Sequence, residues 1–189
     1  LFYVGTAPRD SGRGIEVGSN AAATNFRIYN NTFVDLPFRG LRLSGISHAG
    51  TVVENNIFYR ATADFGDAAH DYNLYTGQND EPNGISHASN PFVNLESFDY
   101  HLIAATGPRR ARDRGRDLGP TYQPDLDGNL RGADGAWDIG AYEYHAGGAP
   151  VVTSAPQAAG GYRLDFSYQI AASPQPVAFA VSGALPPGL

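Results

Sequence analysis

The chain has 189 residues, of which 42 % are hydrophobic and 17 % are charged, a balance that favours a folded core over disorder. Its net charge of −6 argues against a nucleic-acid partner, and no apolar run approaches the roughly 20 residues that span a bilayer. Cysteine is absent, which excludes a disulfide scaffold and a thiolate zinc site, while 23 glycines and 13 prolines favour short strands joined by turns.

The first third of the chain repeats a short pattern of strand-forming residues, two asparagines and an aromatic residue. It occurs at 25–33 and again at 51–58, so that Asn31 and Asn56 lie 56 − 31 = 25 residues apart. A weaker third copy places Asn73 only 73 − 56 = 17 residues further on, followed again by an aromatic residue. Units this short cannot close a core alone, so the pattern predicts stacked supersecondary units.

Alternating hydrophobic residues predict further strands around these copies. Ile15 and Val17 are expected on one face of a strand. Leu41 and Leu43 are likewise expected on one face of a second strand, with Arg42 pointing to the opposite side.

These features resemble the right-handed parallel β-helix family, the pectate-lyase-like solenoids in which each coil carries three short strands. The resemblance rests on the repeated Asn-Asn-x-Phe pattern, which begins at Asn30 and again at Asn55. It implies that asparagine stacks on asparagine between neighbouring coils and that aromatic side chains stack inside the solenoid. The asparagines therefore have a structural role in this interpretation.

A later part of the chain resembles the closing signature of many bacterial secreted β-helix proteins. The matching residues are 89–94, 99–102, the DLDGN-x-R motif at 125–131 and the DIGAYEY motif at 138–144, of which the last two are the most specific. Where that family usually has Ser-Pro-Ala-Ile-Asp, this chain has an arginine-rich stretch at 108–113. Arginines thus fall where apolar packing is expected.

The resemblance implies an all-β fold, a right-handed parallel β-helix with a partial immunoglobulin-like β segment at the C-terminus. The C-terminal coils of the β-helix are expected at 1–145, with earlier coils and any signal peptide before Leu1. Small residues and proline predict a linker at 146–157. Residues 158–189 resemble the truncated start of a bacterial immunoglobulin-like domain, whose hallmark V-S-G-x-L-P-P-G-L ends the chain. A complete sandwich of this type needs about 100 residues.

One acidic stretch has the composition of a calcium-binding loop. Asp125, Asp127 and Asn129 place three oxygen-bearing side chains at alternate positions. The EF-hand spacing is not met, because Gly128 occupies the fourth place of the loop and Ala136 occupies the twelfth.

The favoured interpretation of this acidic stretch is a hydrogen-bonded turn in which Arg131 pairs with Glu143 or with Asp138. Calcium held by the three oxygen-bearing side chains is the alternative. No other cofactor is expected from the sequence.

A catalytic set does not follow from the sequence, although one region has suitable residues. Asp64, Asp67, His70 and Asp71 fall in a stretch rich in glycine and alanine that is expected to protrude from the solenoid. Paired carboxylates serve glycoside hydrolysis, and the resemblance implies lyases that use an arginine or lysine base with calcium-bound acidic sugars. Arg42 and Asp67 are therefore the first candidates, while solvated loop residues remain the favoured interpretation because surface Asp and His are common.

Five arginines lie close together in the sequence, at Arg109, Arg110, Arg112, Arg114 and Arg116. Guanidinium groups bind carboxylates bidentately, so this run has the chemistry to hold an anionic polysaccharide. Its alternation with acidic residues equally suits a solvated face balanced by Asp113 and Asp117, and that is the favoured interpretation.

The resemblance implies a bacterial protein that is secreted or lies at the cell surface, and two functions follow from it. One is binding or processing of a polysaccharide or cell-surface glycan, by a lyase or hydrolase whose groove lies mostly before Leu1. The other is a non-catalytic adhesion or structural protein in which solenoid and immunoglobulin-like modules act as spacers and binding faces. Fold analogy does not choose between them, and the sequence does not set the oligomeric state.

Overall fold

The computed structural model describes residues 2–3, 13–18, 24–43, 47–145, 151–152, 154 and 172–173. The chain divides into two compact units, Leu1–Tyr144 and His145–Leu189. Among the described residues there is no α-helix, and the 3-10 helix Pro120–Tyr122 is the single helical turn. No described helix has the length and apolar character that crossing a membrane requires. The expected all-β class is confirmed.

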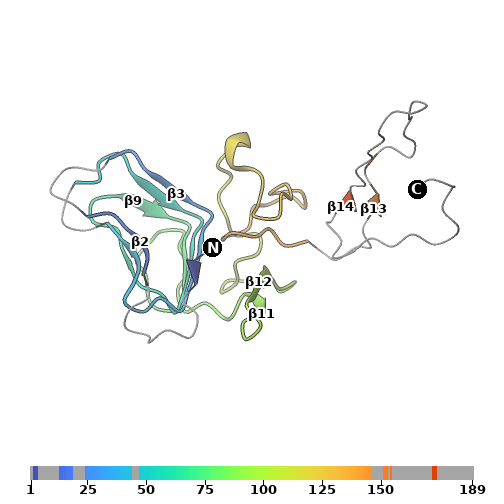
Figure 1. Cartoon of the computed structure of the whole chain (residues 1–189), viewed down its shortest axis with the longest axis horizontal. Helices are drawn as coiled ribbons and strands as arrows, with labels where there is room; N and C mark the ends of the chain where they lie inside the picture. The colour runs from blue at the N-terminus through green and yellow to red at the C-terminus, as the bar shows by residue number, and fades with distance from the viewer. Residues whose placement is uncertain are drawn as a thin grey trace, which may run out of the picture. The chain divides into compact units, whose positions relative to one another are not determined.

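Ten short strands of the first unit form three parallel sheets. Sheet A contains β1 (Phe2–Tyr3), β4 (Thr32–Val34), β7 (Ile57–Tyr59) and β10 (Leu74–Tyr75). Sheet B contains β2 (Arg13–Glu16), β5 (Arg39–Arg42) and β8 (Ala63–Asp64). Sheet C contains β3 (Arg27–Tyr29), β6 (Val52–Glu54) and β9 (Ala69–Asp71). Because the chain visits the three sheets in turn, the strands build successive coils of a β-helix (Figure 1).

Aromatic side chains stack inside the coils, as expected. Phe33, Phe58 and Tyr75 are in register across sheet A. The ring centroids are 4.9 Å apart for the first pair and 5.2 Å apart for the second, and both pairs are stacked. The third copy of the pattern is therefore a true coil despite its shorter spacing. Leu41 and Leu43 also face this core, which confirms the predicted alternation in β5 and the residue that follows it.

The paired asparagines turn the chain from sheet C to sheet A at two corners, and Tyr72 with Asn73 does so at the third. The first residue of the pair, Asn30 or Asn55, has a φ of 55° or 58°, in the left-handed region that asparagine tolerates well. The second forms a ladder: Nδ2 of Asn31 donates to Oδ1 of Asn56 at 3.1 Å, and Nδ2 of Asn56 donates to Oδ1 of Asn73 at 2.9 Å. The predicted stacking of asparagine on asparagine is confirmed.

The prediction of a protruding acidic stretch is wrong. Asp64 ends β8, and His70 and Asp71 belong to β9, so these residues form part of the third coil. The corner between them is tight because Gly66 has a φ of 57° and the Ala68 amide donates to the carbonyl of Phe65 at 3.0 Å. The small Ala68 is buried in the core at this corner.

The outer face of sheet A is covered by residues 86–144, which we call the closing segment. It contains the antiparallel hairpin of β11 (Phe92–Asn94) and β12 (Asp99–Leu102). Ile57 and Leu74 pack in one buried cluster with Phe92, Leu102 and Ile139. Sheet A is therefore buried on both faces, and Figure 1 shows the closing segment beside the β1 side of the coils.

The DIGAYEY motif at the end of the closing segment holds it against the coils. The Gly140 amide donates to the Asn55 carbonyl at 2.9 Å, and the Ala141 amide donates to Oγ1 of Thr32 at 3.0 Å. Within the arginine-rich stretch, Ala111 is buried and its carbonyl accepts from the Ile139 amide at 3.1 Å. Ala111 is thus the apolar residue that this stretch packs against the closing segment's core, and the neighbouring arginines are not part of that core.

In the second unit, β13 (Val151–Val152) and β14 (Ala172–Ser173) form an antiparallel pair. This pair is compatible with the expected partial immunoglobulin-like β segment, and β14 lies within the predicted 158–189, whereas β13 lies within the residues predicted as the linker. The hallmark motif at 181–189 and most of the expected linker at 146–157 lie outside the described residues.

Candidate functional site: the outer face of sheet C

Sheet C carries a row of polar side chains from three successive coils. Tyr29, Glu54 and Asp71 are in register across β3, β6 and β9. The residues before the first two, Ile28 and Val53, are buried in the core, so alternation directs Tyr29, Glu54 and Asp71 outward. Neighbouring strands are about 4.8 Å apart. We call this row the sheet C file.

Two side chains of the closing segment flank the file. Nη1 of Arg116 pairs with Oε1 of Glu54 at 2.7 Å, and the ring of Tyr122 meets that of Tyr29 edge-on, with centroids 5.1 Å apart. The Arg116 side chain is 55 % exposed, whereas that of Glu54 is only 9 % exposed. The guanidinium group therefore keeps donors free to face a ligand beside the file.

Arg116 is fixed by its backbone rather than by the ion pair alone. Its amide donates to Oδ1 of Asn55 at 2.8 Å, and Nδ2 of Asn55 donates to the Arg116 carbonyl at 2.8 Å. Since Asn55 forms the corner directly after Glu54, the same corner positions both members of the ion pair.

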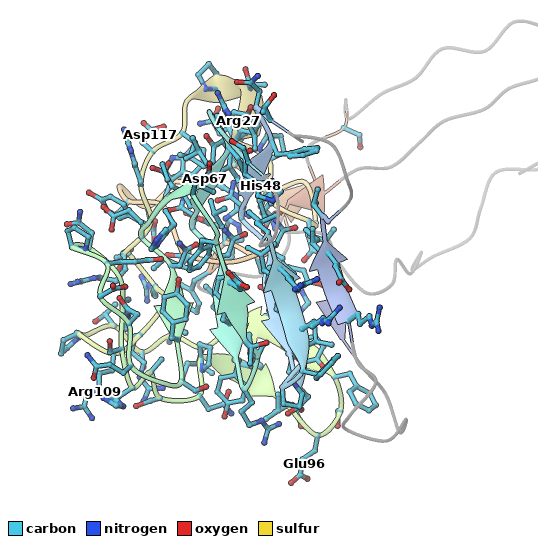
Figure 2. All side chains as sticks on the ribbon, turned by 90° about the vertical axis from the view of Figure 1, so that its left-hand side faces the viewer. Arg27, His48, Asp67, Glu96, Arg109 and Asp117 are labelled. Carbon is cyan, nitrogen blue, oxygen red and sulfur yellow. The ribbon has the colours of Figure 1, made fainter. Side chains whose placement is uncertain are left out.

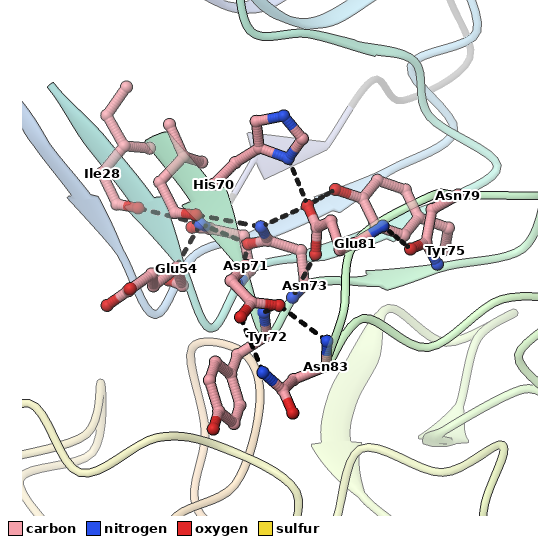
Figure 3. Close-up of polar contacts among 12 residues, drawn as sticks. Ile28, Glu54, His70, Asp71, Tyr72, Asn73, Tyr75, Asn79, Glu81 and Asn83 are labelled. Atoms are coloured by element: carbon pink, nitrogen blue, oxygen red, sulfur yellow. Dashed lines mark hydrogen bonds and ion pairs between the residues drawn. The ribbon is translucent and has the colours of Figure 1, made fainter. Parts of the chain in front are cut away.

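Asp71 is the most thoroughly bonded carboxylate of the file. Both its oxygens accept from Asn83, at 2.8 Å from the backbone amide and 2.7 Å from Nδ2 (Figure 3). Burial raises the pKa of Asp71, but the hydrogen bonds from Asn83 and Tyr72, together with the charge of Arg116, outweigh burial and hold the pKa below its ordinary value. Asp71 is consequently charged at neutral pH and cannot donate a proton.

The catalytic candidates from the sequence are not brought together. Nη1 of Arg42 pairs with Oε1 of Glu16 at 2.8 Å on sheet B. Oδ1 of Asp67 accepts from the His48 amide at 2.6 Å and Oδ2 accepts from the Ser47 hydroxyl at 3.0 Å, so this carboxylate ties two corners together. Figure 2 shows Asp67 beside His48. These contacts give Arg42 and Asp67 structural partners.

The five arginines do not share one face. Nη1 of Arg110 donates to the Asn90 carbonyl at 2.7 Å, and the guanidinium of Arg112 lies 4.0 Å from the ring centre of Tyr144. Arg112 also pairs with Asp113 at 3.4 Å, one of the two acidic partners proposed from the sequence. Arg116 alone of these five reaches the sheet C file.

The acidic stretch of the DLDGN motif forms a turn around Asp125. Oδ1 of Asp125 accepts from the amides of Asp127 and Asn129 at 2.9 and 2.7 Å, and Oδ2 accepts from the Glu143 amide at 3.0 Å. Oδ2 of Asp127 bonds to Nε2 of His101 at 2.8 Å. Across the described ranges, no group of three or more His, Cys, Asp or Glu is arranged to hold a metal ion. Calcium at this loop therefore stays a prediction.

The ion pair predicted for Arg131 is confirmed. Its Nη1 lies 3.5 Å from Oε2 of Glu143, and both side chains are buried. Glu143 also accepts from the amides of Gly132 and Asp138, at 2.6 and 3.0 Å. Burial raises the pKa of Asp138 to about 6 and that of Glu143 to about 7. The buried side chains of Arg131, Asp138 and Glu143 therefore have a structural role within the closing segment.

Comparison of the chain with protein-family models, with curated proteins and with solved structures finds no match.

Proposed function

We propose that this chain belongs to a pectate-lyase-like β-helix protein, secreted or at the cell surface, that binds polysaccharide along the outer face of sheet C. The observation that carries this proposal is the sheet C file itself: Tyr29, Glu54 and Asp71 on three successive coils, with Arg116 and Tyr122 beside them. A row that repeats once per coil suits a ligand that is extended and repetitive.

The chemistry of the row suits sugars. The tyrosine rings offer apolar faces with a polar tip, against which sugar rings can pack. The exposed guanidinium of Arg116 offers parallel donors to a sugar carboxylate. An acidic polysaccharide such as a polyuronate is therefore the favoured ligand.

Binding is better supported than turnover by these residues. Asp71 has a lowered pKa and Glu54 is paired with Arg116, so neither is placed as the proton donor that glycoside hydrolysis needs. We expect residues 1–189 to bind polysaccharide without cleaving it, and lyase or hydrolase activity would belong to coils outside this chain.

The proposal is tested by calorimetric titration of the chain with oligomers of polygalacturonate, alginate and a neutral glucan. We expect acidic oligomers to bind, and Arg116→Ala to weaken binding about tenfold or more, since a charge-assisted hydrogen bond contributes about 1.5–3 kcal/mol. Arg109→Ala is the matched control, because Arg109 is exposed and its side chain forms no hydrogen bond or ion pair with a described residue; Figure 2 labels it. Absence of binding, or equal loss in both variants, would overturn the proposal and favour an adhesion or structural role.

A further inference from the structure

The third coil ends in a cavity that the sheet C file does not include. It has a volume of about 560 Å³ and is bounded by residues 61–66 around β8 and by the loop 77–81. Among the described strands, β8 and β9 are the last members of their sheets, so the next coil does not fill this space. Its volume falls within the range of small-molecule sites, about 300–1,000 Å³.

A buried carboxylate orients a histidine at this cavity. Oε1 of Glu81 lies 3.0 Å from Nδ1 of His70, and the Glu81 side chain is only 1 % exposed (Figure 3). The same oxygen accepts from Nδ2 of Asn73 at 2.9 Å and from the Tyr75 hydroxyl at 2.5 Å. Because a carboxylate accepts in this contact, Nδ1 of His70 is the donor, and in the neutral imidazole Nε2 is then the acceptor.

The Nε2 atom of His70 is available to a ligand. It has no hydrogen bond to any described residue, and the side chain is 29 % exposed where it lines the cavity. Phe65 stacks on the imidazole with ring centroids 4.1 Å apart and adds a flat apolar surface to the same wall. The wall thus combines one hydrogen-bond acceptor with an aromatic platform.

The charge of the lining is one-sided. Asp64, Asp80 and Glu81 supply three carboxyl groups, and no arginine lines the cavity. Gln78 and Asn79 also line the cavity, but their amide oxygens are bonded to Nε2 of His87 and to the Glu81 amide. A ligand rich in hydrogen-bond donors, and carrying positive rather than negative charge, matches this lining.

We propose that the coil-end cavity binds a single amino sugar, with its ring against Phe65, a hydroxyl group donating to Nε2 of His70 and its ammonium group paired with Asp64 or Asp80. This site is separate from the sheet C file, where Arg116 favours acidic sugars. It stands whether or not the sheet C file binds polysaccharide, because the two share no side chain.

The test is a titration of the ¹⁵N-labelled chain, followed by NMR, with glucosamine, N-acetylglucosamine, glucuronate and ammonium chloride. We expect glucosamine to bind most tightly, N-acetylglucosamine more weakly, and the other two to cause no saturable shifts. The affected amides are expected in 61–66 and 77–81. Equal binding of glucuronate, or saturable shifts confined to other residues, would overturn the proposal.

Substitutions of the lining residues test which side chains hold the sugar. Asp64→Asn and Asp80→Asn together are expected to weaken glucosamine binding about tenfold or more, because both charges are removed while side-chain size is kept. Glu96→Gln is the matched control, an exposed carboxylate outside the cavity lining (Figure 2). His70→Phe, checked for an unchanged fold by its amide spectrum, is expected to lose binding as well. An affinity unchanged in the double variant, or reduced equally by Glu96→Gln, refutes the amino-sugar site.

Discussion

The coils and the closing segment satisfy their buried polar groups by different chemistry. In the coils, a neutral amide on each turn bonds to the same amide on the next, as Asn56 does with Asn73. In the closing segment, the buried side chains Asp125, Asp138 and Glu143 each accept from two or more backbone amides of separate loops.

The difference follows from repetition. Each coil has a neighbouring coil of similar backbone shape at a constant distance between strands. A short side chain that both donates and accepts is therefore enough for every coil. The closing segment has little regular pairing beyond one hairpin, so its loop amides need acceptors that gather several donors at once. Carboxylates do this well, but their burial is stabilising only while their charges are compensated.

The largest effect is expected from breaking the charged network. Arg131→Met removes the guanidinium that donates to the carbonyls of Gly140 and Ala141 and faces Glu143. Loss of one partner of a buried ion pair costs about 3–5 kcal/mol, so we expect a decrease of that size in the free energy of unfolding, measured by urea denaturation. Arg109→Met should leave it within about 0.5 kcal/mol. A loss below 1 kcal/mol for Arg131→Met would contradict the structural role of the charges.

A smaller effect is expected from breaking the neutral ladder. Asn56→Ala removes bonds to the carbonyls of Ile28 and Glu54 and to both neighbouring asparagines. Leaving such buried groups unpaired should cost about 2–3 kcal/mol in urea denaturation. Asn31→Ala, at a half-buried rung, should cost about 1 kcal/mol. If both substitutions have the same effect, the ladder does not act as a chain of linked bonds.

The two regions are also expected to differ in how their stability depends on pH. Burial raises the pKa of Asp138 to about 6 and of Glu143 to about 7, so the folded closing segment binds more protons than the unfolded chain and loses stability as pH rises from about 4 to 7. In the coils, Arg39 and Arg42 hold the pKa of Glu16 at about 2, below its ordinary 4.5, so that contribution is full above about 4.5 and is lost on further acidification.

Hydrogen exchange at pH 5 and pH 7.5, corrected for intrinsic rates, measures this contrast. Amides in 125–144 should be better protected at pH 5, while those in 52–59 should be equally protected at both values. Parallel changes in the two regions would show that they do not titrate independently.

The coils could be predicted because their signal is local. Asn73 and Tyr75 take their places in the ladder and the aromatic stack although their spacing is shorter than that of the previous coil. Register is fixed by backbone pairing and by which face is buried, so the turns can vary in length. The same freedom explains the wrong prediction of a protruding stretch, since Gly66 and Ala68 permit a corner much shorter than the earlier ones.

The candidate site could be predicted only in part. Glu54 and Arg116 are 62 residues apart in the sequence, and no local pattern pairs them. One signal was present: the residue before each corner, at Tyr29, Glu54 and Asp71, is polar in every coil and must share one outer face once the asparagines are in register. The coil-end cavity has no such signal, because it depends on where the stacking stops.

Glu81 lies at the end of the asparagine ladder, next to Asn73. Each rung of the ladder receives donors on one side and offers donors on the other, whereas an ionised carboxylate only receives. Glu81 therefore caps the ladder: it accepts from Asn73 and has no donor to pass on to a further rung. A designer who wished to graft an additional coil would begin with Glu81→Gln, which restores an amide that can donate to the next turn.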